Sequence, residues 1–395
     1  MPDFDVLVIG AGLAGAGCVE ELRNAGFTGS VLLVGREPDP PYDRSAVSKG
    51  YLDGSRDRAD TLLHPDDWYG EQDIDLRTRV SVMKLDPAAK VATLSTKDEV
   101  SYDKALLAPG AHVRRLPVDG SDLEGIHYLR ALRNADVLRA DVEGVDRVVL
   151  VGGSYIGTEV AASLTKLGKR VSIVMQEDVV HERGFGRQAG AYFQRVLEEH
   201  GVEVHPGEQL ARFEGAGERV EKVICESGLE LEAGAVVLGV GAVPDTMLAK
   251  AAGLELGERG GVLCDTGLKT SFDGLWVAGD IAEYESVIHG RRLRIEHWEV
   301  AMEQGKFVGR AMATGSDAPY DVVPYFFSDL ADWAGLEYVG PAQEWDGEEV
   351  RGSIEDGEFS VFYRQGDDVV AALVVGRADE IDEARRLMRE SAGIS

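Results

Sequence analysis

The chain contains few cysteines, and no two of them are close together in the sequence. Its 395 residues include only Cys18, Cys225 and Cys264, without a Cys-x-x-Cys motif or the spacing of a metal site. A redox-active disulfide of that type is therefore excluded, and the chain cannot by itself supply four thiolates to an iron–sulfur cluster. We expect all three cysteines to be small buried apolar side chains, and we predict no metal site.

Long apolar runs and positive charge are also scarce. No stretch of about 18 apolar residues occurs, so the sequence predicts no membrane-spanning helix. Lysine and arginine number 41 against 70 aspartates and glutamates, a net charge of -29, which argues against nucleic acid or an anionic membrane as the main partner. The first residues, MPDFDVLVIG, enter an apolar segment without a basic leader, and we expect a cytoplasmic protein.

What the chain does contain is one internal repeat of apolar strand, glycine turn and helix. The stretches DVLVIGAGLAG and VVLVGGSYIGTE place their first turn glycines at Gly10 and Gly152, about one domain's length apart. Uninterrupted apolar residues before each turn are typical of parallel strands that are covered on both faces. The repeat predicts an α/β protein with two doubly wound, Rossmann-like domains.

The first copy, GAGLAG, has the pattern of a dinucleotide-binding turn. Gly10 permits the tight turn, Gly12 lets the backbone approach a pyrophosphate, and Gly15 lets the helix pack on the strand. The helix N-terminus then offers free N–H groups to the phosphates. After the next strand, Arg36 stands in the usual acidic place, and we expect the neighbouring Glu37 to bind the ribose hydroxyls.

The segment that follows, GREPDPPYDRSAVSKGYL, resembles the FAD-dependent ferredoxin reductases of aromatic-ring oxygenase systems. It is similar also to the apoptosis-inducing-factor and monodehydroascorbate-reductase branches. The resemblance implies that Arg44 and Lys49 reach the flavin and its phosphates. A planar guanidinium suits a pyrophosphate, and a cation stabilises the negative charge of a reduced flavin.

Similarity to this family extends over the whole chain. Asp280 in WVAGDIA matches the residue that accepts hydrogen bonds from the ribityl chain of the flavin. Phe327 stands where relatives commonly have tryptophan and is expected to shield the flavin, with a simple core cluster as the alternative. We expect His297 to pack beside the cofactor rather than to catalyse. The resemblance implies further nucleotide contacts at Ala14, Val80, Ala108, Pro109, Gly110, Arg130, Gly241, Gly279, Glu296 and Trp298.

The second glycine turn, GGSYIGTE, is similar to the family pattern Gly-Gly-Gly-Phe-Ile-Gly-x-Glu. The resemblance implies that it binds the nicotinamide nucleotide. Glu159 matches the family glutamate near the nicotinamide, Glu296 is a second candidate, and both can accept from the carboxamide. Together with Lys49 they are the candidate catalytic residues. The remaining predicted contacts of this turn are Gly152, Gly153, Ser154, Tyr155, Ile156 and Gly157.

The choice between NADH and NADPH depends on the end of the next strand, VMQED. Relatives that use NADH often have glutamate where Met175 stands, and Glu177 is offset from that position by two residues. No arginine follows directly to hold a 2′-phosphate, although Arg183 is near in sequence. The sequence favours NADH, and NADPH stays open.

The predicted domain organisation has three parts. Residues 1–115 and 246–319 form a discontinuous FAD-binding domain, and residues 116–245 form the NAD(P)H-binding domain. From 320 to 395 an aromatic-rich segment, VPYFFSDLADW, is followed by short alternating strands and a final amphipathic helix, which predicts a small α+β domain.

The function implied by the resemblance is hydride transfer from NADH or NADPH to FAD, followed by single-electron transfer outward. Because the chain has no redox disulfide motif, the electrons must leave to a separate carrier or a small molecule. The resemblance implies a 2Fe-2S ferredoxin that serves an oxygenase or cytochrome P450. A small radical or quinone as acceptor, and a redox-responsive interaction protein like apoptosis-inducing factor, stay open as alternatives. A homodimer also stays open.

Ser154 occupies the middle glycine position of the turn assigned to the exchangeable nucleotide. Replacing it by glycine, Ser154→Gly, removes a side chain where the backbone approaches phosphate. We expect the affinity for NAD(P)H to change while the FAD content of the purified protein stays the same. Nucleotide titration and flavin absorbance measure the two quantities. Loss of flavin would mean that the two turns are assigned the wrong way round.

Overall fold

The computed structural model describes residues 1–342 and 344–394. The first unit is built on apolar strands that pair in parallel because both of their faces are covered. Its sheet runs β3-β2-β1-β6 with β18 on the other side of β6, and β5 and β4 extend β6 in antiparallel pairing. The strands are β1 (Phe4–Ile9), β2 (Val31–Val34), β3 (Ile74–Arg77), β4 (Val82–Asp86), β5 (Val91–Leu94), β6 (Glu99–Leu107) and β18 (Leu275–Val277).

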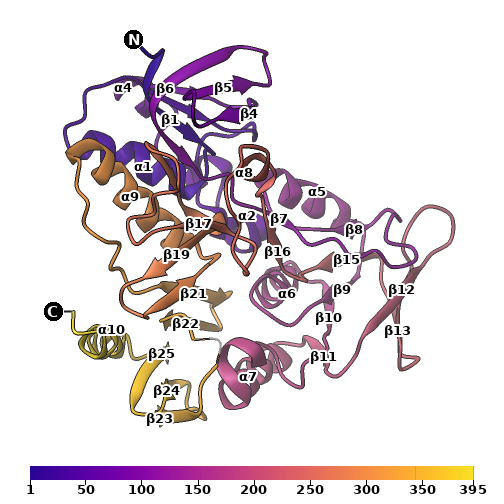
Figure 1. Cartoon of the computed structure of the whole chain (residues 1–395). Helices are drawn as coiled ribbons and strands as arrows, with labels where there is room; N and C mark the ends of the chain where they lie inside the picture. The colour runs from indigo at the N-terminus through magenta and orange to yellow at the C-terminus, as the bar shows by residue number, and fades with distance from the viewer. Residues whose placement is uncertain (343, 395) are drawn as a thin grey trace.

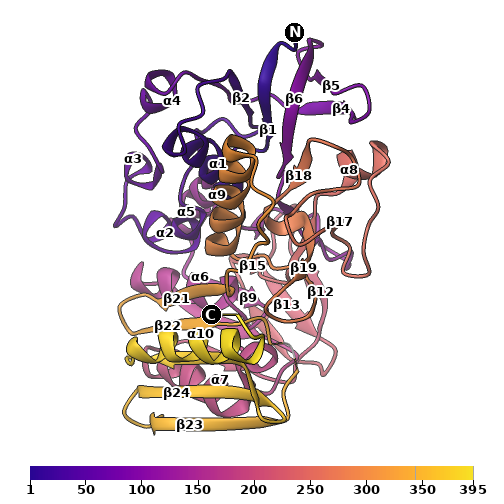
Figure 2. The same cartoon turned by 60° about the vertical axis from the view of Figure 1, so that its left-hand side comes forward.

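Two helices from distant parts of the chain pack together in this unit. α1 (Leu13–Asn24) follows β1, and α9 (Trp298–Thr314) lies beside it (Figure 2). The unit also contains several short elements. They are η1 (Arg44–Ser48), α2 (Gly50–Asp53), α3 (Arg58–Thr61), α4 (Trp68–Glu71), α8 (Met247–Ala251), η2 (Gly279–Ile281) and the small sheet of β17 (Val262–Cys264), β19 (Ala282–Ser286) and β20 (Arg291–Leu293).

The second unit repeats the same architecture, and its five-stranded sheet is parallel throughout, in the order β11-β10-β9-β15-β8. A small antiparallel sheet of three strands projects from it (Figure 1). Its strands are β8 (Ile126–His127), β9 (Arg147–Val151), β10 (Arg170–Val174), β11 (Glu203–His205), β12 (Leu210–Glu214), β13 (Lys222–Cys225), β14 (Glu230–Glu232) and β15 (Ala235–Leu238). Its helices are α5 (Leu132–Val142), α6 (Ile156–Lys166) and α7 (Glu182–Glu199).

A short ribbon carries the chain between these two units. β7 (Ala111–Val113) leads out of the first unit and β16 (Ala242–Pro244) leads back into it. The two strands pair in antiparallel register, with His112 opposite Val243. The second unit is thus inserted into the first. The domain boundaries proposed from the sequence fall next to this ribbon and stay a prediction.

The third unit is an antiparallel sheet in the order β21-β22-β25-β24-β23, with one helix packed on it (Figure 2). Its apolar residues divide between two cores, one shared with the second unit and one against the helix. Together the three units confirm the predicted fold class. The elements are β21 (Tyr325–Leu330), β22 (Ala334–Val339), β23 (Gly347–Ser353), β24 (Glu358–Gln365), β25 (Asp368–Val375) and α10 (Asp379–Ser391).

Cys18, Cys225 and Cys264 are buried free thiols, as expected from their spacing. Burial raises the pKa of the Cys225 thiol to about 11, so this side chain is protonated and unreactive at neutral pH. None of the helices in the part of the chain that the structure describes is long and apolar enough to cross a membrane.

His181 connects the start of α7 to the second glycine turn. Its backbone has a φ of 57°, its N–H donates to the Gly153 carbonyl at 2.8 Å, and its ring Nε2 lies 3.0 Å from the Thr158 hydroxyl. The side chain is 4% exposed, and burial lowers its pKa to about 3. The folded protein therefore holds this imidazole neutral.

This burial predicts a contribution to acid sensitivity. In the unfolded chain the imidazole has a pKa of about 6.5, so the contribution of His181 to stability is complete above that pH and falls as pH drops towards its folded pKa, by about 1 kcal/mol per pH unit. His181→Asn keeps a residue that tolerates positive φ. Its free energy of unfolding, measured with denaturant between pH 6 and 4, should decline less steeply than that of the wild type. Equal slopes would contradict the prediction.

Candidate functional site

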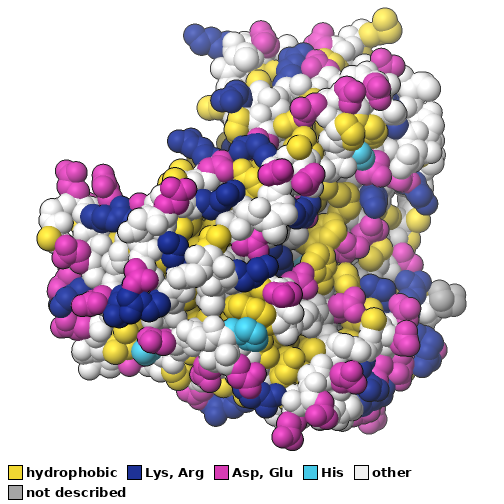
Figure 3. All heavy atoms as spheres, turned by 180° about the vertical axis from the view of Figure 1, so that it is seen from behind, with side chains coloured by type: hydrophobic (Ala, Val, Ile, Leu, Met, Phe, Trp, Pro, Cys, Tyr) yellow, Lys and Arg dark blue, Asp and Glu magenta, His cyan; other side chains and the backbone are white. Residues whose placement is uncertain are grey.

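The two glycine turns open into one cleft of about 780 Å³ that is lined by residues from all three units. Gly10 follows β1 and lies beside Ala108, which follows β6, and Gly152 follows β9 and lies beside Gly239, which follows β15. In each sheet the strand order reverses at this point, which is where open α/β sheets bind ligands. Seen from behind, the hollow shows a band of hydrophobic side chains between charged rims (Figure 3).

Most of the residues predicted from the sequence lie on this cleft. The exceptions are Gly15, Gly152, Gly153, Gly157 and Glu177. The predicted residues that line it are Gly10, Gly12, Ala14, Arg36, Glu37, Arg44, Lys49, Val80, Ala108, Pro109, Gly110, Arg130, Ser154, Tyr155, Ile156, Glu159, Gly241, Gly279, Asp280, Glu296, His297, Trp298 and Phe327.

Each glycine of the first turn is required for a different local reason. A Cβ at Gly10 would lie 2.0 Å from the Ala108 carbonyl oxygen, and one at Gly15 would lie 2.0 Å from that of Gly10. A Cβ at Gly12 meets no described protein atom within 4 Å and would point into open space. Gly12 also precedes α1 without a side-chain cap, so the first N–H groups of that helix are available. The turn therefore fits the pyrophosphate of a dinucleotide.

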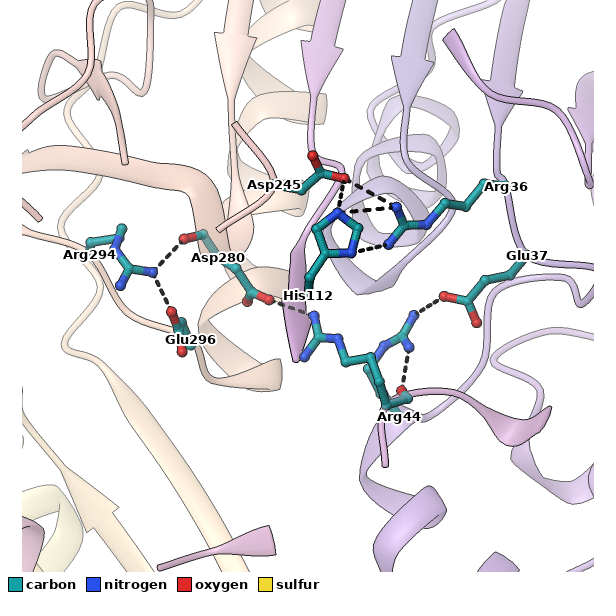
Figure 4. A network of polar contacts seen from close by, with 9 residues as sticks. Arg36, Glu37, Arg44, His112, Asp245, Asp280, Arg294 and Glu296 are labelled. Atoms are coloured by element: carbon teal, nitrogen blue, oxygen red, sulfur yellow. Dashed lines mark hydrogen bonds and ion pairs between the residues drawn. The ribbon is translucent and has the colours of Figure 1, made fainter. Parts of the chain in front are cut away.

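Arg44 and Glu37 form an ion pair at the end of β2 (Figure 4). The guanidinium donates to the Glu37 carboxylate and to the Arg130 carbonyl, each at 2.7 Å, and the Tyr42 hydroxyl donates to Glu37 at 2.6 Å. Burial alone would raise the pKa of Glu37, but the Arg44 charge and these hydrogen bonds lower it below its ordinary value. Glu37 is therefore an ionised acceptor, which suits ribose hydroxyls.

A second ion pair joins the first and second units beside the cleft. Arg130, between β8 and α5, donates to the Asp280 carboxylate at 2.7 Å. Asp280 lies in η2 directly after β18, and its backbone carbonyl accepts from Arg294 at 3.0 Å (Figure 4). A carboxylate with a free lone pair on the cleft wall suits a hydroxylated chain such as ribityl.

Glu159 is the most enclosed charge on the cleft, at 6% exposure. It accepts from the Ser48 hydroxyl at 2.5 Å and the Ser328 hydroxyl at 2.6 Å, and the Lys49 ammonium lies 2.8 Å away. That ammonium is 5.7 Å from the centre of the Phe327 ring. The four polar groups come from all three units, so the carboxylate holds Lys49 in place where the units meet.

Sequence reasoning missed Ser48 and Ser328, although each is adjacent to a residue that it selected. Period-two alternation along β21 was an available signal for Ser328, because it directs this side chain to the face opposite Phe327. Ser48 had no such signal, because it lies in the short helix η1 and not in an alternating strand.

Aromatic side chains pack around His297 in the wall of the cleft. The His297 and Phe326 rings stack at 4.0 Å, and the Tyr155 ring stands edge-on to both, at 6.1 and 5.1 Å. Burial lowers the pKa of His297 to about 4, so the ring is neutral at pH 7. These contacts agree with the expectation of a packed histidine. Phe326 is a further cleft residue that sequence reasoning missed.

Two of the predicted carboxylates have other partners. Glu296 lines the cleft and pairs with Arg294 at 2.5 Å, whereas Glu177 lies outside the lining and pairs with Arg183 at 2.6 Å. The structure thus brings Glu159 and Glu296 to the cleft and leaves Glu177 beyond it. Arg294 and Arg183 are partners that the sequence could not identify without the fold.

Comparison with known proteins gives the family. A model described as pyridine nucleotide-disulphide oxidoreductase matches residues 4–305, and one described as reductase C-terminal matches residues 325–395. The chain belongs to the pyridine nucleotide-disulphide oxidoreductase family. It is an FAD-binding oxidoreductase of the ferredoxin reductase type that uses NAD(P)H, as the sequence indicated.

Similar proteins align along nearly the whole chain. Putidaredoxin reductase CamA of Pseudomonas putida is 32% identical over 98% of this chain and 92% of its own. The ferredoxin–NAD(+) reductase component of the biphenyl dioxygenase system of Paraburkholderia xenovorans is 33% identical over 99% and 94%. The solved covalent putidaredoxin reductase–putidaredoxin complex superposes with a TM-score of 0.92 at 32% identity, covering 99% of this chain and 94% of that one.

Gly12 and Gly15 provide a matched test of the first turn. Gly12→Ala adds a methyl group only to the cleft, so the apoprotein should unfold at the wild-type temperature while the dissociation constant for FAD rises about tenfold or more, or about 1.4 kcal/mol. Gly15→Ala meets a carbonyl and should destabilise the apoprotein by about 1–3 kcal/mol. Thermal unfolding and FAD titration followed by flavin fluorescence measure both. Wild-type FAD affinity in Gly12→Ala would exclude pyrophosphate binding at this turn.

Proposed function

We propose that this protein carries electrons from NAD(P)H through FAD to a 2Fe-2S ferredoxin that serves an oxygenase or cytochrome P450. The observation that carries the proposal is the single cleft shared by two dinucleotide turns, with the Lys49–Glu159 pair at their junction. Relatives named for putidaredoxin and for a dioxygenase system support the acceptor. When bound, FAD supplies the conversion between a two-electron hydride donor and a one-electron acceptor.

For the FAD site we propose distinct roles for the residues of the first unit. The turn at Gly10 and Gly12 receives the pyrophosphate, and the Arg44 guanidinium adds positive charge beside it. Glu37 accepts from the adenosine ribose and Asp280 from the ribityl chain. The aromatic rings of Trp298 and Phe327, whose centres lie 5.9 Å apart, exclude water from the cleft. The other predicted positions in this part of the cleft supply backbone and packing contacts.

The Lys49 ammonium places a positive charge on the cleft wall, and such a charge would stabilise the negative charge of a reduced flavin. Because Glu159, which two serine hydroxyls hold in place, fixes this ammonium, no reorganisation is needed when the charge develops. We propose that Glu159 also accepts from the carboxamide of the nicotinamide, with Glu296 as the second candidate. The chain then contributes position and electrostatics rather than acid–base chemistry.

We propose that the second turn, with Ser154, Tyr155 and Ile156 on the cleft, receives the exchangeable nucleotide. Glu177, which follows β10, supports NADH over NADPH, because a 2′-phosphate near it would meet a carboxylate.

We propose the three-part domain division at 115/116, 245/246 and 319/320, which the position of the ribbon and the start of β21 at Tyr325 support. We propose a cytoplasmic location as well.

Two assays test the electron donor and the electron acceptor separately. With ferricyanide as acceptor, the purified holoprotein should oxidise NADH, with a kcat/KM above that for NADPH. Cytochrome c should be reduced slowly by the holoprotein alone and at least about tenfold faster when a 2Fe-2S ferredoxin is added. No NAD(P)H oxidation would refute the reductase function.

If ferredoxin adds nothing to cytochrome c reduction, the partner assignment fails and the reductase function stands. Saturable turnover of a quinone or small radical without ferredoxin would then favour a reductase that acts on such a small molecule. Slow flavin reduction with a persistent long-wavelength absorbance band would instead favour a redox-responsive interaction protein. Apoptosis-inducing factor 3 of Mus musculus is 28% identical over 98% of this chain and 64% of its own length.

A further inference from the structure

A polar cluster lies on the wall of the cleft where the ribbon meets the first unit (Figure 4). Arg36 follows β2, His112 is the middle residue of β7, and Asp245 directly follows β16. The Asp245 carboxylate lies 2.9 Å from the His112 ring Nε2 and 3.2 Å from the Arg36 guanidinium. The Arg36 guanidinium and the His112 ring are also in contact, at 3.3 Å. We call these three residues the ribbon cluster.

The ribbon has little of its own to hold it rigid. β7 and β16 pair only three residues each, and two further backbone bonds extend the pairing, from Arg114 to Gly241 and from Asp245 to Gly110, both at 2.9 Å. A two-stranded ribbon of this length is marginally stable by itself. The ribbon cluster adds a side-chain attachment that ties both strands to the segment that follows β2 of the first unit.

The second unit has another attachment to the first unit, through different residues. α2 packs against α5 and α6, with Tyr51 and Leu52 in the core that the second and third units share. The Ser163 hydroxyl donates to the Ser48 carbonyl at 2.8 Å, and Lys166 pairs with Asp53 at 3.2 Å. This packed contact restrains the second unit at α6, and the ribbon cluster restrains it at the two strands that join it to the first.

The Asp245 side chain is 15% exposed, whereas those of Arg36 and His112 are 46% exposed. An acceptor that is shielded in this way interacts more strongly with its partners than a surface carboxylate does. Asp245→Asn removes the charge and keeps the shape of the side chain. The guanidinium then loses its counter-ion, and the restraint on both strands weakens.

We propose that the ribbon cluster sets the orientation of the NAD(P)H-binding unit against the FAD-binding unit, with Asp245 as the positioning residue for hydride transfer. Transfer requires the donating carbon of the nicotinamide and the accepting nitrogen of the flavin to lie within about 3–3.5 Å of each other, and a misplacement of about 1 Å costs on the order of a hundredfold in rate. A loosened ribbon shifts the second unit without changing its own nucleotide-binding surface. The proposal rests on hydride transfer between the two nucleotides and is independent of the final acceptor.

The experiment is a single turnover without acceptor. Holoprotein with saturating FAD is mixed anaerobically with NADH, and the loss of flavin absorbance gives the rate constant for reduction. Asp245→Asn should lower this rate constant about tenfold, with the dissociation constants for FAD and for a non-reducing NADH analogue within twofold of wild type. As a control, Glu230→Gln makes the same type of change in an exposed pair, with Lys222 at 2.8 Å on the outer antiparallel sheet, and should change none of these values.

A charge exchange provides an independent measurement. The double variant Arg36→Asp with Asp245→Arg restores opposite charges, and its rate constant should exceed that of Asp245→Arg alone. The proposal is overturned if Asp245→Asn reduces its flavin at the wild-type rate, or if the double variant is no faster than the single one. It is also overturned if Asp245→Asn loses FAD affinity but, once saturated, reacts normally, because the cluster would then be an adenosine contact. A wild-type protein that NADH does not reduce refutes the reductase function itself.

Discussion

The buried Glu159 carboxylate is the interaction on which the cleft depends. It stands at the start of α6 in the second unit, and its partners Lys49 and Ser328 belong to the first and third units. A buried charge is tolerated only when its partners are in place, so this contact favours one arrangement of the three units over others. The same contact leaves the Lys49 ammonium on the cleft wall, so one feature provides both the assembly of the units and the electrostatics of the site.

The architecture could be predicted largely because its signals are local. Apolar strands before GAGLAG and GGSYIG, and the change to aromatic, alternating residues near Tyr325, each act within a dozen residues. The ribbon could not be predicted in this way. AHV and AVP are three-residue segments without a periodic pattern, and their pairing depends on the insertion of a whole domain between them.

The residues of the site also fall into two classes, those that the neighbouring sequence identifies and those that only the fold brings together. Residues within glycine turns or family-like segments, such as Gly12, Lys49 and Asp280, could be selected because the neighbouring sequence identifies them. His112 and Asp245 could not, because their partners are far away in the chain and their own neighbours give no signal. For Glu177, the position in the sequence predicted a nucleotide contact; the structure pairs it with Arg183 outside the cleft lining, and the contact stays a prediction.

The inserted arrangement also has a consequence for how the protein is made. β18 pairs with β6 in the middle of the first sheet, and the whole second unit separates them in the chain. Contacts of such long sequence separation form late, since the intervening loop must first be closed. During synthesis the second unit emerges as one continuous segment and can fold before the sheet that precedes it is finished. Asp280 and α9 reach the cleft only after that, so the incomplete first sheet exposes apolar strands to aggregation until β18 and α9 have been made.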